Sequence, residues 1–139
     1  AMGDESNEFH REVVRPKGML NMDANVRQHL LAAGINVDTA LERFLRNSAL
    51  MEKYLRRFPD DPNYALLCQA MEQGDMEAAF TAAHTLKGVA GNLSLDALFA
   101  ATSTVVESLR RRDLSAAREQ MLPLQHAYGQ VLDALSAWR

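Results

Sequence analysis

From about residue 22 onward, apolar residues recur at intervals of three and four, and a helix-stop signal separates one group from the next. This spacing is typical of amphipathic helices, and no segment shows the convincing polar–apolar alternation of a strand. Short connections at 34–37, 94–96 and 113–115 force neighbouring helices to run antiparallel. The sequence predicts an all-α fold, an antiparallel four-helix bundle with additional N-terminal helices. The predicted helices span 23–33, 36 or 38–58, 62–73, 75–93, 96–112 and 115–138.

Particular residues set the ends of these predicted helices. Gly34 and Gly74 are expected to stop the helices before them, since glycine accepts the left-handed conformation that ends many helices. Pro59 should end the second helix, and Ser115 should cap the last one. Pro123 lies inside the last apolar stripe and should kink or split that helix.

The apolar periodicity also divides the chain into two parts. Residues 1–21 lack it and are expected to be a tail or linker, with Ala1-Met2-Gly3 open to interpretation as a cloning remnant. Residues 22–139 are expected to form a single helical bundle domain, because a chain of this length fits one compact core.

Charge and composition disfavour several classes of function. The net charge of −3 argues against nucleic-acid binding. No apolar run approaches the roughly 20 residues that cross a bilayer, so we expect a cytoplasmic domain, either free or at the cytosolic end of a membrane-bound sensor kinase. The single cysteine, Cys68, is expected to be a small buried side chain. No metal site is expected, because His10, His29 and His126 are scattered without paired ligands.

The predicted helix 75–93 carries the candidate chemistry. At about 100° per residue, its apolar residues gather on one side, and His84 points roughly 120° away from the centre of that stripe. Lys87 and Gly88 follow His84 at positions i+3 and i+4, so both lie beside the imidazole. The apolar residues of the stripe are Met76, Ala79, Ala83, Leu86, Ala90 and Leu93.

These three residues suit phosphoryl chemistry. A neutral imidazole has a nitrogen lone pair near physiological pH and can attack phosphorus without a dedicated base. The ammonium of Lys87 would stabilise the dianionic product, and Gly88 leaves space for another protein. Spacing alone also fits a solvated histidine with a chance lysine nearby. Gly88 could instead cap the helix, but Ala90 and Leu93 continue the apolar stripe and favour an uninterrupted helix.

Residues 83–93 resemble the His-x-x-Lys-Gly signature of the histidine phosphotransfer (HPt) domain family. Their sequence is Ala-His-Thr-Leu-Lys-Gly-Val-Ala-Gly-Asn-Leu. The resemblance covers about residues 30–135, including 34–44 and 50–58. It implies that His84 is phosphorylated on Nε2, that Lys87 stabilises the phosphoryl group and that Gly88 keeps access open. The sequence departs from the family after Leu93, where Ser94 stands close to the usual place of a glycine.

The resemblance further implies a phosphoryl carrier in a multistep two-component phosphorelay. A receiver-domain aspartate would phosphorylate His84, which would pass the group to another receiver. The chain would be a monomer without a kinase site or cofactor, and the Mg²⁺ would belong to the receiver. The alternatives are a non-phosphorylated interaction module and the phosphate-accepting domain of a chemotaxis-type kinase. Candidate partner contacts are Phe80, Gly91 and Arg110, while Ser103, Glu107 and Arg110 remain open as the polar neighbour of His84 on the next helix.

Overall fold

The computed structural model describes residues 24–138, which are helical apart from short connections and an isolated antiparallel bridge between Ile35 and Leu95. The predicted all-α fold is therefore confirmed for these residues. The predicted tail 1–21, the start of the first helix and His10 lie outside them. The helices are α3 (Ala24–Ala32), α4 (Val37–Arg43), α5 (Ser48–Arg57), the 3-10 helix η1 (Phe58–Asp60), α6 (Asn63–Gln73), α7 (Met76–Asn92), α8 (Asp96–Arg110) and α9 (Leu114–Ala137).

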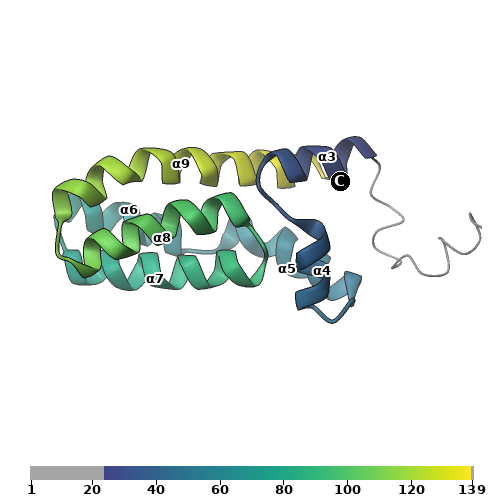
Figure 1. Ribbon diagram of the computed structural model, residues 1–139, viewed down its shortest axis with the longest axis horizontal. Helices are drawn as coiled ribbons and strands as arrows, with labels where there is room; N and C mark the ends of the chain where they lie inside the picture. Colours follow the sequence, from purple (N-terminus) through teal and green to yellow (C-terminus); the bar gives the residue numbers. More distant parts are fainter. Residues whose placement is uncertain (1–23, 139) are drawn as a thin grey trace, which may run out of the picture.

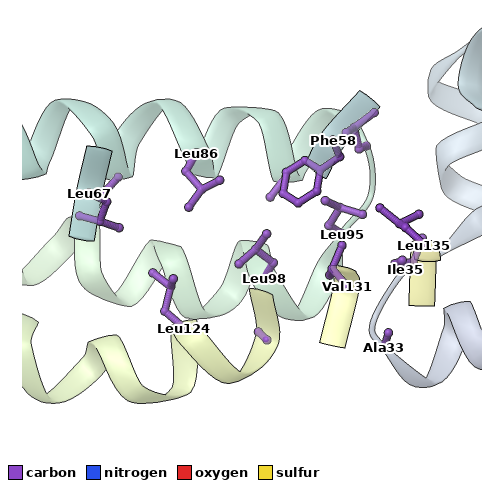
Figure 2. Packing of buried hydrophobic residues seen from close by; sticks show 14 of the residues in the cluster. Ala33, Ile35, Phe58, Leu67, Leu86, Leu95, Leu98, Leu124, Val131 and Leu135 are labelled. Atoms are coloured by element: carbon purple, nitrogen blue, oxygen red, sulfur yellow. The ribbon is translucent and has the colours of Figure 1, made fainter. Parts of the chain in front are cut away.

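Helices α6 to α9 form the bundle, in which α7 packs against both α6 and α8, and α8 packs against α9 (Figure 1). Helix α3 lies along the C-terminal end of α9, and α4 and α5 lie at the same end of the bundle. Each bundle helix contributes a fully buried leucine to the core: Leu67, Leu86, Leu98 and Leu124 (Figure 2). Burying one such side chain stabilises a fold by roughly 1.5–3 kcal/mol. None of the helices in residues 24–138 is long and apolar enough to cross a membrane.

Several predicted helix ends are confirmed. Gly34 and Gly74 both have left-handed backbones, with φ of 83° and 68°; Gly34 lies two residues after the end of α3, and Gly74 directly follows α6. Asn36 caps α4, because its side chain accepts a hydrogen bond from the Thr39 amide at 3.1 Å. Pro59 lies in η1, immediately after the end of α5.

The predicted helix from 36 or 38 to 58 is wrong, because the chain turns between α4 and α5. Leu45 and Arg46 both have positive φ, and the Arg46 amide donates to the Leu41 carbonyl at 2.8 Å to close the end of α4. Asn47 then caps α5 by accepting from the Leu50 amide at 3.1 Å. The apolar spacing continues across this break, so periodicity could not reveal it.

The last helix also differs from the prediction. Helix α9 begins at Leu114, because Asp113 and not Ser115 provides the cap by accepting from the Ala116 amide at 3.0 Å. Pro123 does not split α9, which continues to Ala137. A proline inside a helix costs about 3 kcal/mol, and fully buried apolar residues on both sides of it, such as Ala117 and Leu124, offset that cost.

Cys68 on α6 is half-buried, whereas the sequence led us to expect a buried side chain. It lies beside Tyr64, whose ring stacks on Tyr128 of α9 with centroids 3.8 Å apart. Burial and a hydrogen bond with Cys68 raise the pKa of Tyr64 to about 12. The cysteine therefore belongs to the contact between α6 and α9.

The turn between α7 and α8 contains Ser94, where the resemblance led us to expect a glycine nearby. Ser94 has a φ of 54°, a left-handed conformation that favours glycine. Its buried hydroxyl accepts a hydrogen bond from Nε of Arg43 at 3.1 Å, which glycine could not do. Its carbonyl accepts from the Asn36 amide at 2.9 Å. The serine thus ties the α3–α4 segment to the end of α7.

Substitutions of Ser94 should separate the cost of its left-handed backbone from the benefit of its side-chain hydrogen bond. Ser94→Ala keeps the strained backbone and loses the hydrogen bond, so it should lower the free energy of unfolding by about 1 kcal/mol. Ser94→Gly loses the same bond but relieves a backbone cost of roughly 1 kcal/mol, so it should be close to wild type. Urea denaturation of the three proteins measures this difference. An alanine variant as stable as the glycine variant would contradict the strain at this position.

Candidate functional site

His84 lies in the middle of α7, exposed to solvent. The face of α7 behind it is fully buried in the bundle, where Ala79, Ala83, Leu86 and Ala90 have no exposed surface. The predicted outward orientation of His84 is therefore confirmed. Small alanines on the inner face let α7 lie close to its neighbours, so His84 projects from a firmly packed helix.

Helix α7 continues without interruption past Gly88 to Asn92. Of the glycines in residues 24–138, Gly34 and Gly74 have a positive φ, and Gly88 does not. The interpretation of Gly88 as a helix cap is therefore wrong. A Cβ built on Gly88 would have nothing within 4 Å, so the space over it is open. Because glycine in a helix interior costs about 1 kcal/mol relative to alanine, packing within the described chain does not account for this residue.

Lys87 and Gly91 lie beside a residue that the sequence analysis did not single out, Phe99 in the first turn of α8. Nζ of Lys87 is 5.7 Å from the centroid of the Phe99 ring. A Cβ on Gly91 would be 3.2 and 3.3 Å from two carbons of the same ring, which is tighter than ordinary contact. The aromatic residue itself was visible in the sequence, but its pairing with Lys87 depends on how α7 and α8 pack.

Arg110 of α8 contacts Phe80, which lies one helical turn before His84 on α7. Its guanidinium carbon lies 5.2 Å from the centroid of the Phe80 ring, and that ring is 5.7 Å from the His84 imidazole, centroid to centroid. Phe80 is half-buried and precedes His84 by one helical turn. The two sequence candidates Phe80 and Arg110 are therefore neighbours, and Phe80 lies between Arg110 and His84 in this series of contacts.

The other two polar candidates on α8 interact within α8, one with the backbone and one with Arg110. The Ser103 hydroxyl donates to the Phe99 carbonyl of its own helix at 2.7 Å. Glu107 pairs with Arg110, with 3.5 Å between Oε1 and Nε. Of Ser103, Glu107 and Arg110, the geometry favours Arg110 as the α8 side chain that reaches toward the His84 face.

The surface around His84 is open. One groove runs between α5, η1 and the end of α7, lined by residues such as Tyr54, Phe58 and Val89. A second lies between α6 and the start of α7. His84 lines neither groove. Among residues 24–138, no group of three or more His, Cys, Asp or Glu side chains is placed to hold a metal ion. An exposed nucleophile on the outer face of a helix, outside both grooves, suits a reaction with another protein.

The sequence model of the Hpt domain matches residues 49–138, which is more than half of the chain and runs from α5 through α9. Helices α3 and α4 lie outside the match. No curated protein and no solved structure matches the chain significantly. Hpt domains are phosphoryl carriers of phosphorelays that interact with receiver domains and have no kinase activity of their own. The match covers the helices that build and surround the His84 face. Its extent shows that the chain belongs to the Hpt domain family.

Proposed function

We propose that this chain carries a phosphoryl group between receiver domains on Nε2 of His84. The Nε2 lone pair would attack phosphorus in the acyl phosphate of a receiver aspartate. The bond between phosphorus and the carboxylate oxygen would break, and its electron pair would return to the carboxylate. Transfer to a second receiver would reverse these steps. The observation that carries the proposal is an exposed His84 with Lys87 and the open Gly88 beside it, within the Hpt match.

Two cations would stabilise the phosphorylated imidazole. The product carries dianionic oxygens, which form strong charge-assisted hydrogen bonds with ammonium and guanidinium groups. Lys87 follows His84 by three residues on the same helix face. Arg110 lies over the ring of Phe80, which precedes His84 by one helical turn, and it would be the second cation.

The receiver would supply the rest of the chemistry. Phosphoryl transfer needs a metal ion to neutralise the developing charge, and this Mg²⁺ would be held by the receiver. The receiver would dock over Phe80 and Arg110, with Gly88 leaving room for its active site, whereas Gly91, the third partner candidate from the sequence, lies against the Phe99 ring. The chain would act as a monomer in the cytoplasm, where receivers reside.

A panel of phosphorylated receiver domains, each incubated with the purified chain and Mg²⁺, tests the proposal. At least one receiver should transfer its label to the chain within minutes, and adding a second receiver should remove it. If no receiver in a broad panel labels the chain, the proposal fails and a non-phosphorylated interaction module becomes the better account. Labelling by a chemotaxis-type kinase but by no receiver would place the chain in the kinase pathway instead.

ATP and Mg²⁺ alone should not label the chain. The sequence has no glycine-rich phosphate loop, and His84 lines neither of the two grooves described above. Incubation with radiolabelled ATP followed by electrophoresis at neutral pH measures this directly. Stoichiometric labelling by ATP would reveal a catalytic site of the chain's own.

A further inference from the structure

We infer that Phe99 is a positioning residue, which orients the side chain of Lys87 three residues after His84, and that Gly91 makes room for its ring. The inference rests on the proposed function, since Lys87 has a role only if His84 carries a phosphoryl group. Neither Phe99 nor its pairing with Lys87 belongs to the His-x-x-Lys-Gly motif. The inference comes from two contacts between α7 and α8 and from the hydrogen bonds that hold the Phe99 backbone within α8.

The first contact is between the ring and the cation. Lys87 Nζ lies 5.7 Å from the Phe99 centroid, within the range in which a ring face attracts an ammonium. Lys87 takes part in none of the ion pairs found among residues 24–138. It is half-buried, unlike a lysine that extends freely into water. Its stem therefore lies along the protein surface with the ring as the partner of its charged end.

The second contact places the ring. Gly91 lies four residues after Lys87 on the same face of α7, and the Phe99 ring rests directly on it. A methyl group at position 91 would approach the ring to 3.2 Å, so the ring would have to move by a few tenths of an ångström. Gly91 thus serves contact with α8, whereas the space over Gly88 is open to solvent.

Hydrogen bonds fix the backbone of Phe99 within α8. Its amide donates to the Leu95 carbonyl at 2.8 Å, and its carbonyl accepts from the Ser103 hydroxyl at 2.7 Å. Phe99 nevertheless remains 38% exposed, so its ring is only partly used for core packing. A ring on a fixed backbone can restrict the rotamers of a long, flexible lysine, which reduces the entropy lost when the ammonium binds the phosphoryl group.

Arg110 and Phe80 provide an internal comparison. They form a similar cation–ring contact on the other side of His84, at 5.2 Å. Arg110, however, also pairs with Glu107 at 3.5 Å, so it has a second group that orients it. Removing Phe99 should therefore affect Lys87 more than an equivalent change at Phe80 affects Arg110.

A double-mutant cycle between Phe99 and Lys87 tests the inference, with the phosphorylated receiver that labels the wild-type chain most rapidly. Phe99→Leu should lower the maximal transfer rate by about 2- to 5-fold, the size of an exposed cation–π contact, with KM for the receiver unchanged. In a Lys87→Gln background, Phe99→Leu should have no further effect. Gly91→Ala should reproduce the loss in the wild-type background and be silent beside Phe99→Leu.

Proton NMR gives a readout that does not depend on phosphotransfer. The Phe99 ring current should shift the Lys87 side-chain methylene resonances upfield, and Phe99→Leu should abolish that shift. An equal rate loss from Phe99→Leu with and without Lys87 would make Phe99 a docking residue and overturn the inference. An unchanged or faster rate, or unshifted Lys87 resonances in the wild type, would overturn it as well. If no receiver labels the wild type, the proposed function fails and this inference falls with it.

Discussion

Replacing His84 with glutamine should abolish phosphoryl acceptance from every receiver that labels the wild-type chain. The free energy of unfolding should change by less than about 0.5 kcal/mol, because His84 is exposed and its ring contact is a tilted one with Phe80 at 5.7 Å between centroids. Glutamine also favours helices, so α7 should be intact. Labelling and urea denaturation on the same preparation measure both effects.

His126→Gln is the matched control for this experiment. His126 is likewise an exposed histidine inside a helix, but it lies on α9. This variant should retain full labelling and wild-type stability. Retained labelling of His84→Gln, or loss of labelling in the control, would remove His84 from the proposed chemistry.

Replacing Gly88 with glutamine should produce a protein that is more stable but a poor phosphoryl acceptor. Because α7 continues through Gly88 and nothing lies within 4 Å of an added Cβ, a good helix former should stabilise the fold by up to about 1 kcal/mol. The longer side chain would stand one turn from the imidazole, where the receiver must approach. A displacement of about 1 Å in the reacting groups can cost roughly 100-fold in rate, and we expect a loss of that order.

Gly129 on α9 offers a matched control, since a Cβ there would also have nothing within 4 Å. Gly129→Gln should bring a similar gain in stability and leave the transfer rate unchanged. Gly88→Ala should be stabilised too, with a smaller loss of rate because its side chain is short. A stable Gly88→Gln protein that transfers at the wild-type rate would show that a receiver does not need this space.

The parts of the fold that follow from local chemistry could be predicted from the sequence. Gly34 and Gly74 end helices because glycine tolerates positive φ, and Asn36 caps α4 with its side chain. The break at Leu45 and Arg46 could not be predicted in this way. Both residues adopt a conformation that their type disfavours, and the apolar spacing continues across them. The capping ability of Asn47 was the one local signal of a new helix.

The same distinction applies to the candidate site. His84, Lys87 and Gly88 could be found from the sequence because they lie on one helix. Residues three and four positions apart are neighbours on the surface of a helix. Their neighbours on α8 depend on how α7 and α8 are aligned along each other. The spacing of apolar residues in the sequence does not specify that alignment. Several polar candidates on α8 therefore stayed open, and nothing in the sequence indicated Phe99, which contacts Lys87 from the first turn of α8.

The position and the chemical nature of the phosphoryl linkage test the central claim most directly. The chain would be phosphorylated by a receiver, digested at alkaline pH and analysed by mass spectrometry, with parallel samples held in acid and in base. A single phosphoryl group should lie on the peptide that contains His84, be lost in acid and persist in base, as a phosphoramidate does. Phosphate on His29 or His126, or a base-labile acyl phosphate on an aspartate, would contradict the account.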